Sequence, residues 1–214
     1  MTFASRTDAG KRLGRLLRDE GLQADLVLGL PRGGVVVAAA VSRMLHQPLD
    51  VLVVRKIGHP WYREFAVGAL AEPDVVILDE DSLRRNPVGR AQLDEVIAEE
   101  TGRLRQYQAE FHRRVRPGLS GKRVVLVDDG LATGATMEAA VRAARRQEAS
   151  RVIVAVPVAS THALQRLEIL ADAVKALLVD DDFRAVGQYY AEFSQTSDAE
   201  VLALLQEAAA EEEP

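Results

Sequence analysis

The sequence contains no cysteine, and this absence excludes both a disulfide framework and any metal site built on thiolates. It also contains no apolar run of the roughly 18 residues that a membrane-spanning helix requires. The opening stretch MTFASRTDAGKRLG lacks the long apolar core of a signal peptide. From these absences we expect a cytoplasmic protein without a membrane span.

Histidine and net positive charge are also scarce. The four histidines show no spacing typical of metal ligands, so transition-metal chemistry has no support: His46, His59, His112 and His162. A net charge of −5 argues against a general nucleic-acid coat protein. The chain of 214 residues, 48% hydrophobic and 28% charged, is long enough for one well-buried globular domain.

Apolar strand-like runs alternate with amphipathic helical patterns along most of the chain. Continuous runs rich in Val and Leu are typical of parallel strands that are buried on both faces. The expected strands are 24–30, 50–56, 122–128, 151–158 and 173–179, and the expected helices lie near 34–46, 134–148 and 161–171. The sequence therefore predicts an α/β fold, with a mostly parallel twisted sheet and helices on both faces.

Two segments interrupt this alternation. Residues 64–79 contain two strand-like runs around the turn Glu72-Pro73-Asp74, which predicts an inserted hairpin. After it, Asn86 is expected to cap a long amphipathic helix with Pro87 at its first position. The basic residues near the end of that helix either complement the helix dipole, which we favour, or form a nucleic-acid patch: Arg113, Arg114 and Arg116.

Small residues follow the first expected strand, in the stretch GLPRGGVVVA at 29–38. Pro31, Gly33 and Gly34 permit a tight turn in which backbone N–H groups converge, and Arg32 adds a positive charge. This combination suits an anion, and a plain strand-to-helix turn is the alternative. The pattern matches neither the dinucleotide-binding nor the Walker consensus.

The stretch VVLVDDGLATGATM at 124–137 places two carboxylates and a loop of small residues at the end of another strand. The loop leads into a helix, whose first N–H groups and dipole favour a phosphate, assisted by the hydroxyls of Thr133 and Thr136. Asp128 and Asp129 would repel that phosphate, whereas carboxylates accept hydrogen bonds from sugar hydroxyls. The stretch therefore predicts a sugar-phosphate site, and the alternative is that both acids only cap local turns.

The run VVLVDDGLATGAT resembles the signature of the type I phosphoribosyltransferases, which use phosphoribosyl pyrophosphate (PRPP). LPRGG resembles their pyrophosphate loop, and the resemblance covers residues 22–179, which we interpret as the core. Residues 1–21 and 180–214 would flank this core within one domain, the second flank forming a small C-terminal hood and a helix. VGALAE and FRAVGQYYAEFSQ resemble a bacterial group whose acceptor is undefined. Gly130 replaces a residue that is often apolar in the signature, and we expect this difference only to loosen the turn.

The resemblance implies a role for each of these residues. Asp128 and Asp129 would hold the ribose hydroxyls, and the turn Arg32-Gly33-Gly34 would hold the pyrophosphate. Mg²⁺ would bridge pyrophosphate to ribose oxygens, held mainly by PRPP and water with a contribution from the two acids. The residues implied around the 5′-phosphate are Ala132, Thr133, Gly134, Ala135 and Thr136.

The resemblance also implies that residues 57–64, IGHPWYRE, form a mobile lid. Such a lid closes over PRPP and keeps water away from the reacting carbon. Lys56, His59 and Arg63 are candidates to meet the pyrophosphate charge, and we group Lys56 and Arg63 with the two acids as predicted catalytic residues. The alternative is that these three side chains are ordinary solvated loop residues.

Seven of the ten aromatic residues fall in two short stretches outside the expected sheet: Trp61, Tyr62 and Phe65 in the lid, and Phe183, Tyr189, Tyr190 and Phe193 in the hood. Phe183 follows the last strand directly, so we expect it to stack on a planar acceptor base. The other three hood aromatics are expected to pack a small core of the hood.

The activity implied by the resemblance is transfer of 5-phosphoribosyl from PRPP to a nitrogen of a heterocyclic, purine- or pyrimidine-like base, with release of pyrophosphate. The expected partners are PRPP, Mg²⁺ and a small base, not nucleic acid or a membrane, and a homodimer is left open. The alternative is a non-catalytic sensor of PRPP or nucleotides. The intact acids and both anion loops favour the enzyme, and no helix-turn-helix pattern supports a DNA-binding regulator.

Overall fold

The computed structural model describes residues 2–63, 65–112 and 118–212. Its centre is a five-stranded sheet with the order β2-β1-β6-β7-β8, in which every neighbouring pair is parallel. The strands are β1 (Leu26–Gly29), β2 (Leu49–Val51), β6 (Arg123–Val127), β7 (Arg151–Ser160) and β8 (Ala173–Asp180). The predicted α/β fold is confirmed.

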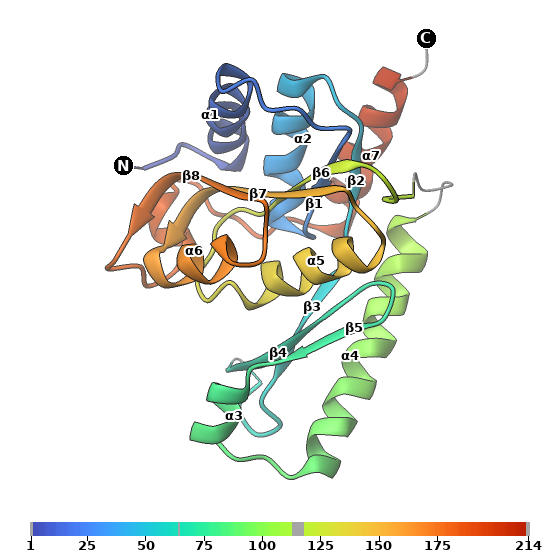
Figure 1. Cartoon of the computed structure of the whole chain (residues 1–214), viewed down its shortest axis with the longest axis vertical. Helices are drawn as coiled ribbons and strands as arrows, with labels where there is room; N and C mark the ends of the chain where they lie inside the picture. The colour runs from blue at the N-terminus through green and yellow to red at the C-terminus, as the bar shows by residue number, and fades with distance from the viewer. Residues whose placement is uncertain (1, 64, 113–117, 213–214) are drawn as a thin grey trace.

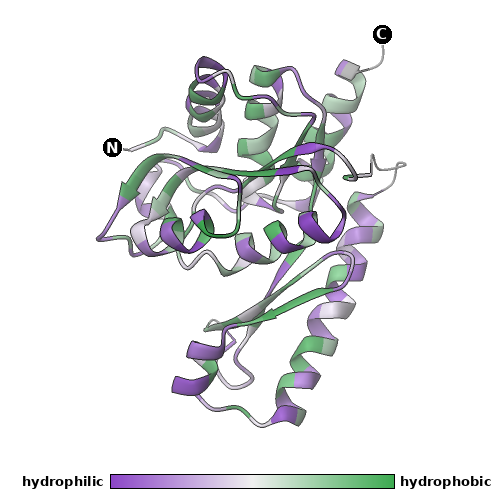
Figure 2. Cartoon of the chain, viewed as in Figure 1, coloured by the Kyte–Doolittle hydropathy of each residue, from purple (hydrophilic) through white to green (hydrophobic). Residues whose placement is uncertain are grey.

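Helices cover both faces of this sheet (Figure 1). One face carries α1 (Arg6–Asp19), α2 (Gly33–Leu45) and α7 (Asp198–Glu212), and the other carries α5 (Ala135–Arg146) and α6 (Thr161–Glu168). Strand residues alternate between the two faces, so an apolar strand is buried on both, and Figure 2 shows the strands as mostly hydrophobic. Among the described residues no helix is long and apolar enough to span a membrane.

A second, three-stranded sheet carries the inserted hairpin. It is antiparallel, with the order β3 (Val54–Gly58), β4 (Ala66–Ala71) and β5 (Val75–Leu78), so the predicted hairpin is confirmed. With α3 (Glu80–Arg85) and α4 (Arg90–Phe111) it forms a unit that we call the arm, which lies below the parallel sheet in Figure 1. Apolar residues of β4 and β5 join the same core cluster as α5, so the arm is packed against that helix.

The expected strand 50–56 is wrong in one respect, because it is divided between the two sheets. The Leu52 N–H donates to the carbonyl of Gly29 at 3.1 Å, whereas the Val53 N–H donates to the buried carboxylate of Glu72 at 3.0 Å. The chain therefore changes its hydrogen-bonding partner between these two residues. Residues 51–54 are apolar and buried on both sides of the change, so the sequence pattern gives no sign of it.

The long helix begins later than expected. Asp79 accepts a hydrogen bond from the Ser82 N–H at 3.0 Å and caps the short helix α3. Asn86 follows α3 as its C-cap and does not cap α4, which begins at Arg90. Pro87 disfavours helical backbone at the residue before it, which separates the two helices. The apolar face of α4 is buried as expected, through Leu93, Val96, Leu104 and Phe111. The basic residues expected near its end lie outside the described residues: Arg113, Arg114 and Arg116.

The N-terminal flank contains a helix that the sequence analysis did not predict. Ser5 caps α1 by accepting a hydrogen bond from the Asp8 N–H at 3.3 Å. α1 lies close against α2 because Gly10 has no side chain, and a Cβ there would lie 2.6 Å from the carbonyl oxygen of Val37. The close packing fixes the position of α1 and of Arg6 in its first turn.

This packing makes a stability prediction. Gly10→Ala should destabilise the protein by about 1–3 kcal/mol, because the added methyl group overpacks the contact of α1 with α2. Each kcal/mol should lower the melting temperature by about 2–4 °C for a chain of this size.

Gly102 is the matched control. It lies inside α4, and a Cβ added there meets nothing within 4 Å. Gly102→Ala should stabilise the protein by about 0.5–1 kcal/mol through helix propensity. A Gly10→Ala variant that melts as high as Gly102→Ala would contradict the close packing of α1.

Candidate active site

The carboxyl ends of β1 and β6 lie side by side, with Gly29 paired to Val127. The two loops predicted to bind the ligand follow directly and contact each other. A Cβ on Gly33 would lie 2.2 Å from Oδ2 of Asp129, and a Cβ on Gly34 would lie 2.8 Å from Oδ1 of Asp128. Glycine is therefore required at both positions, because the backbone of one loop fills the space beside the carboxyl groups of the other.

A pocket of about 680 Å³ lies at this end of the sheet, between the loops and the arm. Pro31, Asp128 and Thr136 line it from the loops. From the arm it is lined by β3, the turn after β3 and α4, through Val54, Arg55, Lys56, Gly58, Arg63, Glu99, Glu100 and Arg103. Four of the predicted site residues thus meet in one pocket, namely Asp128, Thr136, Lys56 and Arg63.

The loop between β6 and α5 is held in a fixed conformation. Gly134 has a φ of 77°, in the left-handed region that favours glycine, and α5 begins at the next residue. Oγ1 of Thr133 accepts a hydrogen bond from the Ala135 N–H at 3.4 Å, and the Ser160 hydroxyl donates to the carbonyl of Ala132 at 2.6 Å. The first N–H groups of α5 have no acceptor within the helix and are suited to an anion beside Thr136.

Burial dominates the electrostatics of the two acids. It raises the pKa of Asp128 well above its ordinary value, and the negative charge of Asp129 raises this pKa further. Burial also raises the pKa of Asp129, and this effect is opposed by Arg6, whose Nε donates to Oδ2 of Asp129 at 2.7 Å. The backbone N–H of Asp129 donates to Oδ1 of Asp128 at 2.8 Å. Charging two adjacent buried carboxyl groups at the same time is unfavourable, and a bound cation would stabilise this doubly charged state.

Arg6 is a site residue that the sequence analysis missed. It contacts Asp129 from 123 positions away along the chain. No motif contains it, and the sequence analysis placed it in a flanking segment. Only the packing of α1 on the sheet brings it to the acid pair.

Charged residues of α4 were missed as well. Glu99 pairs with Arg63 at 2.8 Å, and Glu100 pairs with Arg55 at 2.9 Å. Arg103 contacts both glutamates, at 2.6 Å and 2.7 Å. Their spacing along the helix is a visible signal of a shared face, because residues three and four apart are neighbours. Nothing in the sequence indicates that this face meets β3.

Some predicted site residues lie outside the lining of the pocket. The Arg32 guanidinium lies 3.8 Å from the carboxylate of Asp198, at the start of α7. The Phe183 ring packs on Tyr189 with centroids 5.2 Å apart and is half-buried in the hood. Asp129 is turned toward Arg6, and the pocket wall at the acid pair is formed by Asp128.

The segment predicted as a lid is a tight turn between β3 and β4. The His59 N–H donates to the carbonyl of Phe65 at 2.8 Å, and the Tyr62 N–H donates to the carbonyl of His59 at 3.1 Å. The His59 ring is 2% exposed and lies among three exposed aromatic rings, those of Trp61, Tyr62 and Phe65. His59 thus organises the turn and does not line the pocket, while Glu64 lies outside the described residues.

The expected packing of the two hood tyrosines is confirmed, since Tyr189 is 4% and Tyr190 is 6% exposed. The Tyr189 hydroxyl donates to the carboxylate of Asp180 at 2.7 Å. Burial and this carboxylate raise the pKa of Tyr189 to about 12. Phe193 packs on Tyr190 with centroids 5.2 Å apart, but it remains 40% exposed.

The hood lies directly against the acid pair. The Tyr190 hydroxyl donates to the carbonyl oxygen of Asp129 at 2.6 Å. A Cβ on Gly130 would lie 2.8 Å from Cγ1 of Val186, which belongs to the hood. Glycine at 130 therefore makes room for the hood, and our expectation that it only loosens the turn is wrong.

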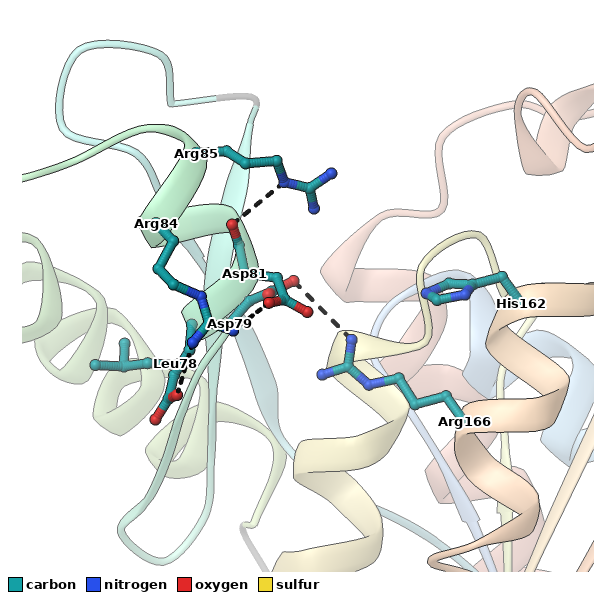
Figure 3. A pocket seen from close by; sticks show the side chains of 8 residues that line it. Leu78, Asp79, Asp81, Arg84, Arg85, His162 and Arg166 are labelled. Carbon is teal, nitrogen blue, oxygen red and sulfur yellow. Dashed lines mark hydrogen bonds and ion pairs between the residues drawn. The ribbon is translucent and has the colours of Figure 1, made fainter.

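A second pocket of about 420 Å³ lies between α3 and α6 (Figure 3). Arg84 is hydrogen-bonded to Asp81, and Arg166 lies 4.0 Å from Asp79 (Figure 3). Arg85 donates from Nε to the backbone carbonyl of Asp81 at 3.2 Å. No motif falls here, whereas Asp128 and Thr136 of the signature line the first pocket, so the first pocket is the stronger candidate.

Comparison with known proteins places the chain in a family. A family model described as "Phosphoribosyl transferase domain" matches residues 6–194. A protein of Mycobacterium tuberculosis H37Rv, provisionally named a phosphoribosyl transferase, is 44% identical over 207 residues, which are 96% of this chain and 47% of the relative. The chain thus spans about half the length of the curated relatives it matches.

Solved structures share the fold. The crystal structure of TT1426 from Thermus thermophilus is 45% identical with a TM-score of 0.80, over 97% of this chain and 99% of that chain. The AQ2163 protein from Aquifex aeolicus is 14% identical with a TM-score of 0.51, over 85% of this chain and 78% of that chain. This second similarity is one of fold alone.

The raised pKa of Asp128 makes a prediction about stability and pH. The folded-state pKa lies above the ordinary value of 3.8, so folding becomes less favourable as the pH rises through the folded pKa. Asp128→Asn removes this charge and keeps an oxygen for the Asp129 N–H. Without metal, the variant should be more stable than the wild type by about 1–3 kcal/mol near neutral pH, the usual cost of an uncompensated buried polar group.

Melting curves in EDTA from about pH 4 to about pH 8 test this, because the gain should shrink toward the acidic end. Asp74→Asn is the control, since the Asp74 side chain is 64% exposed. A gain that is equal at every pH would contradict the assignment to the Asp128 charge.

Proposed function

Because the chain belongs to the phosphoribosyl transferase family, as its signature predicted, we propose that it transfers 5-phosphoribosyl from PRPP to a nitrogen of a heterocyclic base. Pyrophosphate is the second product and Mg²⁺ is the cofactor in this proposal. The observation that carries it is the buried acid pair beside the N-terminus of α5, whose member Asp128 lines a pocket that the arm closes with four basic residues and two glutamates.

PRPP fits the pocket by the chemistry of its parts. The ribose diol donates hydrogen bonds to Asp128 and Asp129, which as carboxylates repel phosphates. The 5′-phosphate lies in the loop 132–136, where the N-terminus of α5 favours an anion. The pyrophosphate lies against the turn Arg32-Gly33-Gly34, with Lys56 and Arg63 on the opposite side of the pocket.

The acid pair also fits Mg²⁺. Carboxylate oxygens are the ligands this ion prefers, and it commonly keeps waters and substrate oxygens as its other ligands. Among the described residues there is no group of three or more His, Asp or Glu side chains placed to hold a metal, so in this proposal PRPP supplies most of the coordination. Asp128 and Asp129 are the residues that would hold Mg²⁺, which when bound would offset the charge of the pyrophosphate leaving group.

The protein itself contributes orientation and exclusion of water. The reacting ribosyl carbon becomes cation-like as its bond to pyrophosphate breaks, so the ribose must be held while the base nitrogen approaches. Asp128 and Asp129 hold the ribose, and the basic residues of the arm stabilise the departing anion. The segment predicted as a lid remains the proposed lid, and its exposed residues Trp61 and Tyr62 suit a surface that closes on a ligand.

Calorimetry with PRPP tests the proposal. PRPP should bind in the presence of Mg²⁺ and lose affinity in excess EDTA, because its phosphates then repel the acids. Asp128→Asn should weaken binding by about 1–3 kcal/mol through the lost hydrogen bond, while Asp74→Asn should bind like the wild type.

Equal affinity with and without EDTA would contradict the role of Mg²⁺. A panel of bases with pyrophosphate release as the readout then separates the enzyme from the sensor. Binding of PRPP without turnover of any base would favour the sensor.

The acceptor is proposed to stack on Phe183. Such stacking on one aromatic face is worth about 1–3 kcal/mol by analogy with base–aromatic contacts in nucleic-acid proteins. Phe183→Ala should therefore raise the KM of the accepted base about tenfold to a hundredfold, with PRPP affinity unchanged. A variant that instead melts earlier, with an unchanged KM, would assign Phe183 to the core of the hood.

A further inference from the structure

Arg6 is held at the acid pair by three separate contacts. Its Nε donates to Oδ2 of Asp129 at 2.7 Å, and its Nη1 donates to the carbonyl of Ser194 at 2.7 Å. The guanidinium carbon also lies 3.9 Å from the centroid of the Phe193 ring. The side chains of Arg6 and Asp129 are only 12% and 15% exposed. The guanidinium therefore donates two hydrogen bonds from its edge and lies with its face over an aromatic ring, so it has little freedom to move.

The contact determines the orientation of Asp129. Oδ2 of Asp129 lies 2.2 Å from the position that a Cβ of Gly33 would take, and Nε of Arg6 lies 2.7 Å from that position. The Asp129 carboxylate thus lies against the turn Arg32-Gly33-Gly34, which we call the pyrophosphate turn, whereas Asp128 lines the pocket. Each acid has one oxygen engaged by the protein, Oδ1 of Asp128 by a backbone N–H and Oδ2 of Asp129 by Arg6. The two carboxylates are therefore not equivalent.

Arg6 also connects the acid pair to the hood. The segment before it pairs with the hood, since the Phe3 N–H donates to the carbonyl of Tyr189 at 2.7 Å and the Ala191 N–H donates to the carbonyl of Phe3 at 2.8 Å. Phe193 stacks on Tyr190, whose hydroxyl binds the backbone of Asp129. The acid pair, the N-terminal segment and the hood thus form one connected cluster.

We propose that Arg6 is a positioning residue for phosphoribosyl transfer, which holds the Asp129 carboxylate against the pyrophosphate turn and in fixed relation to the hood. The inference rests on the proposed function for its effect on PRPP. Without Arg6, the Asp129 carboxyl group would lose its hydrogen-bond donor and its counter-charge, and it would be free to rotate beside the turn Arg32-Gly33-Gly34. PRPP would then meet a misplaced group.

The experiment compares Arg6→Gln, Arg6→Lys and a matched control. Arg6→Gln should lower the affinity for PRPP with saturating Mg²⁺ about tenfold to a hundredfold, the scale expected when a positioning group is misplaced. Arg6→Lys keeps the charge but not the forked geometry, so its affinity should be intermediate. Arg15→Gln is the control on the same helix, because Arg15 is an exposed residue of α1.

A double-mutant cycle distinguishes positioning from a general loss of stability. Asp129→Asn should weaken PRPP binding, and Arg6→Gln should add little to that loss, because Arg6 acts through Asp129. Fully additive losses, or wild-type affinity in Arg6→Gln, would overturn the proposal. If Arg6→Gln does not fold, Arg6→Lys decides, and wild-type affinity in that variant overturns the proposal.

A crystal structure of the variant makes this test independent of the proposed function. If the wild type fails to bind PRPP with Mg²⁺, the proposed function fails. Even in that case, the structure of Arg6→Gln should show the Asp129 carboxylate rotated away from Gly33. If only Arg6→Lys folds, the same rotation is expected in that variant. An unchanged Asp129 would overturn the positioning role even if PRPP binds.

Discussion

The burial of two adjacent carboxyl groups at the end of β6 is the constraint on which the rest of the site depends. Burial raises the pKa of both, so the protein must surround them with groups that tolerate or offset negative charge. The structure provides a backbone N–H for Asp128, a guanidinium for Asp129 and two glycines that leave room for both side chains. A site that is unfavourable when charged is well suited to a ligand that arrives with a cation.

The topology explains why this pair lies beside the anion loop. β1 is flanked by β2 on one side and by β6 on the other, so the chain reverses its direction of progress across the sheet between β1 and β6. Ligand sites of open α/β sheets form at such a switch point, outside the carboxyl ends of the strands. The arm lies in the sequence between β2 and β6 of the parallel sheet. Its residues Arg55, Lys56 and Arg63 line the same pocket as Asp128.

The sequence predicted what depends on local pattern, and it missed what depends on tertiary contacts. The strands, the hairpin and both ligand loops follow from apolar runs and from the residue types at 29–34 and 128–136. The division of the expected strand 50–56 follows from a change of partner at Leu52 and Val53, which no periodicity records. Arg6 was missed for the same reason, since its role depends on the packing of α1 against α2. Pro87 was predicted as the first residue of the long helix, but it lies in the segment between α3 and α4. The same proline is a local signal for the separation of the two helices.

The hood and the acid pair are coupled more closely than the motif alone suggests. Gly130 follows the acids directly, and the space that a side chain would take there is filled by Val186 of the hood. The Tyr190 hydroxyl holds the backbone of Asp129 from the same side, and Phe193 supports Arg6. A displacement of the hood would therefore disturb Asp129 through both its backbone and its side chain. Because the hood is the proposed acceptor side and Asp129 belongs to the proposed ribose side, contacts within the protein link the two halves of the reaction before either substrate binds.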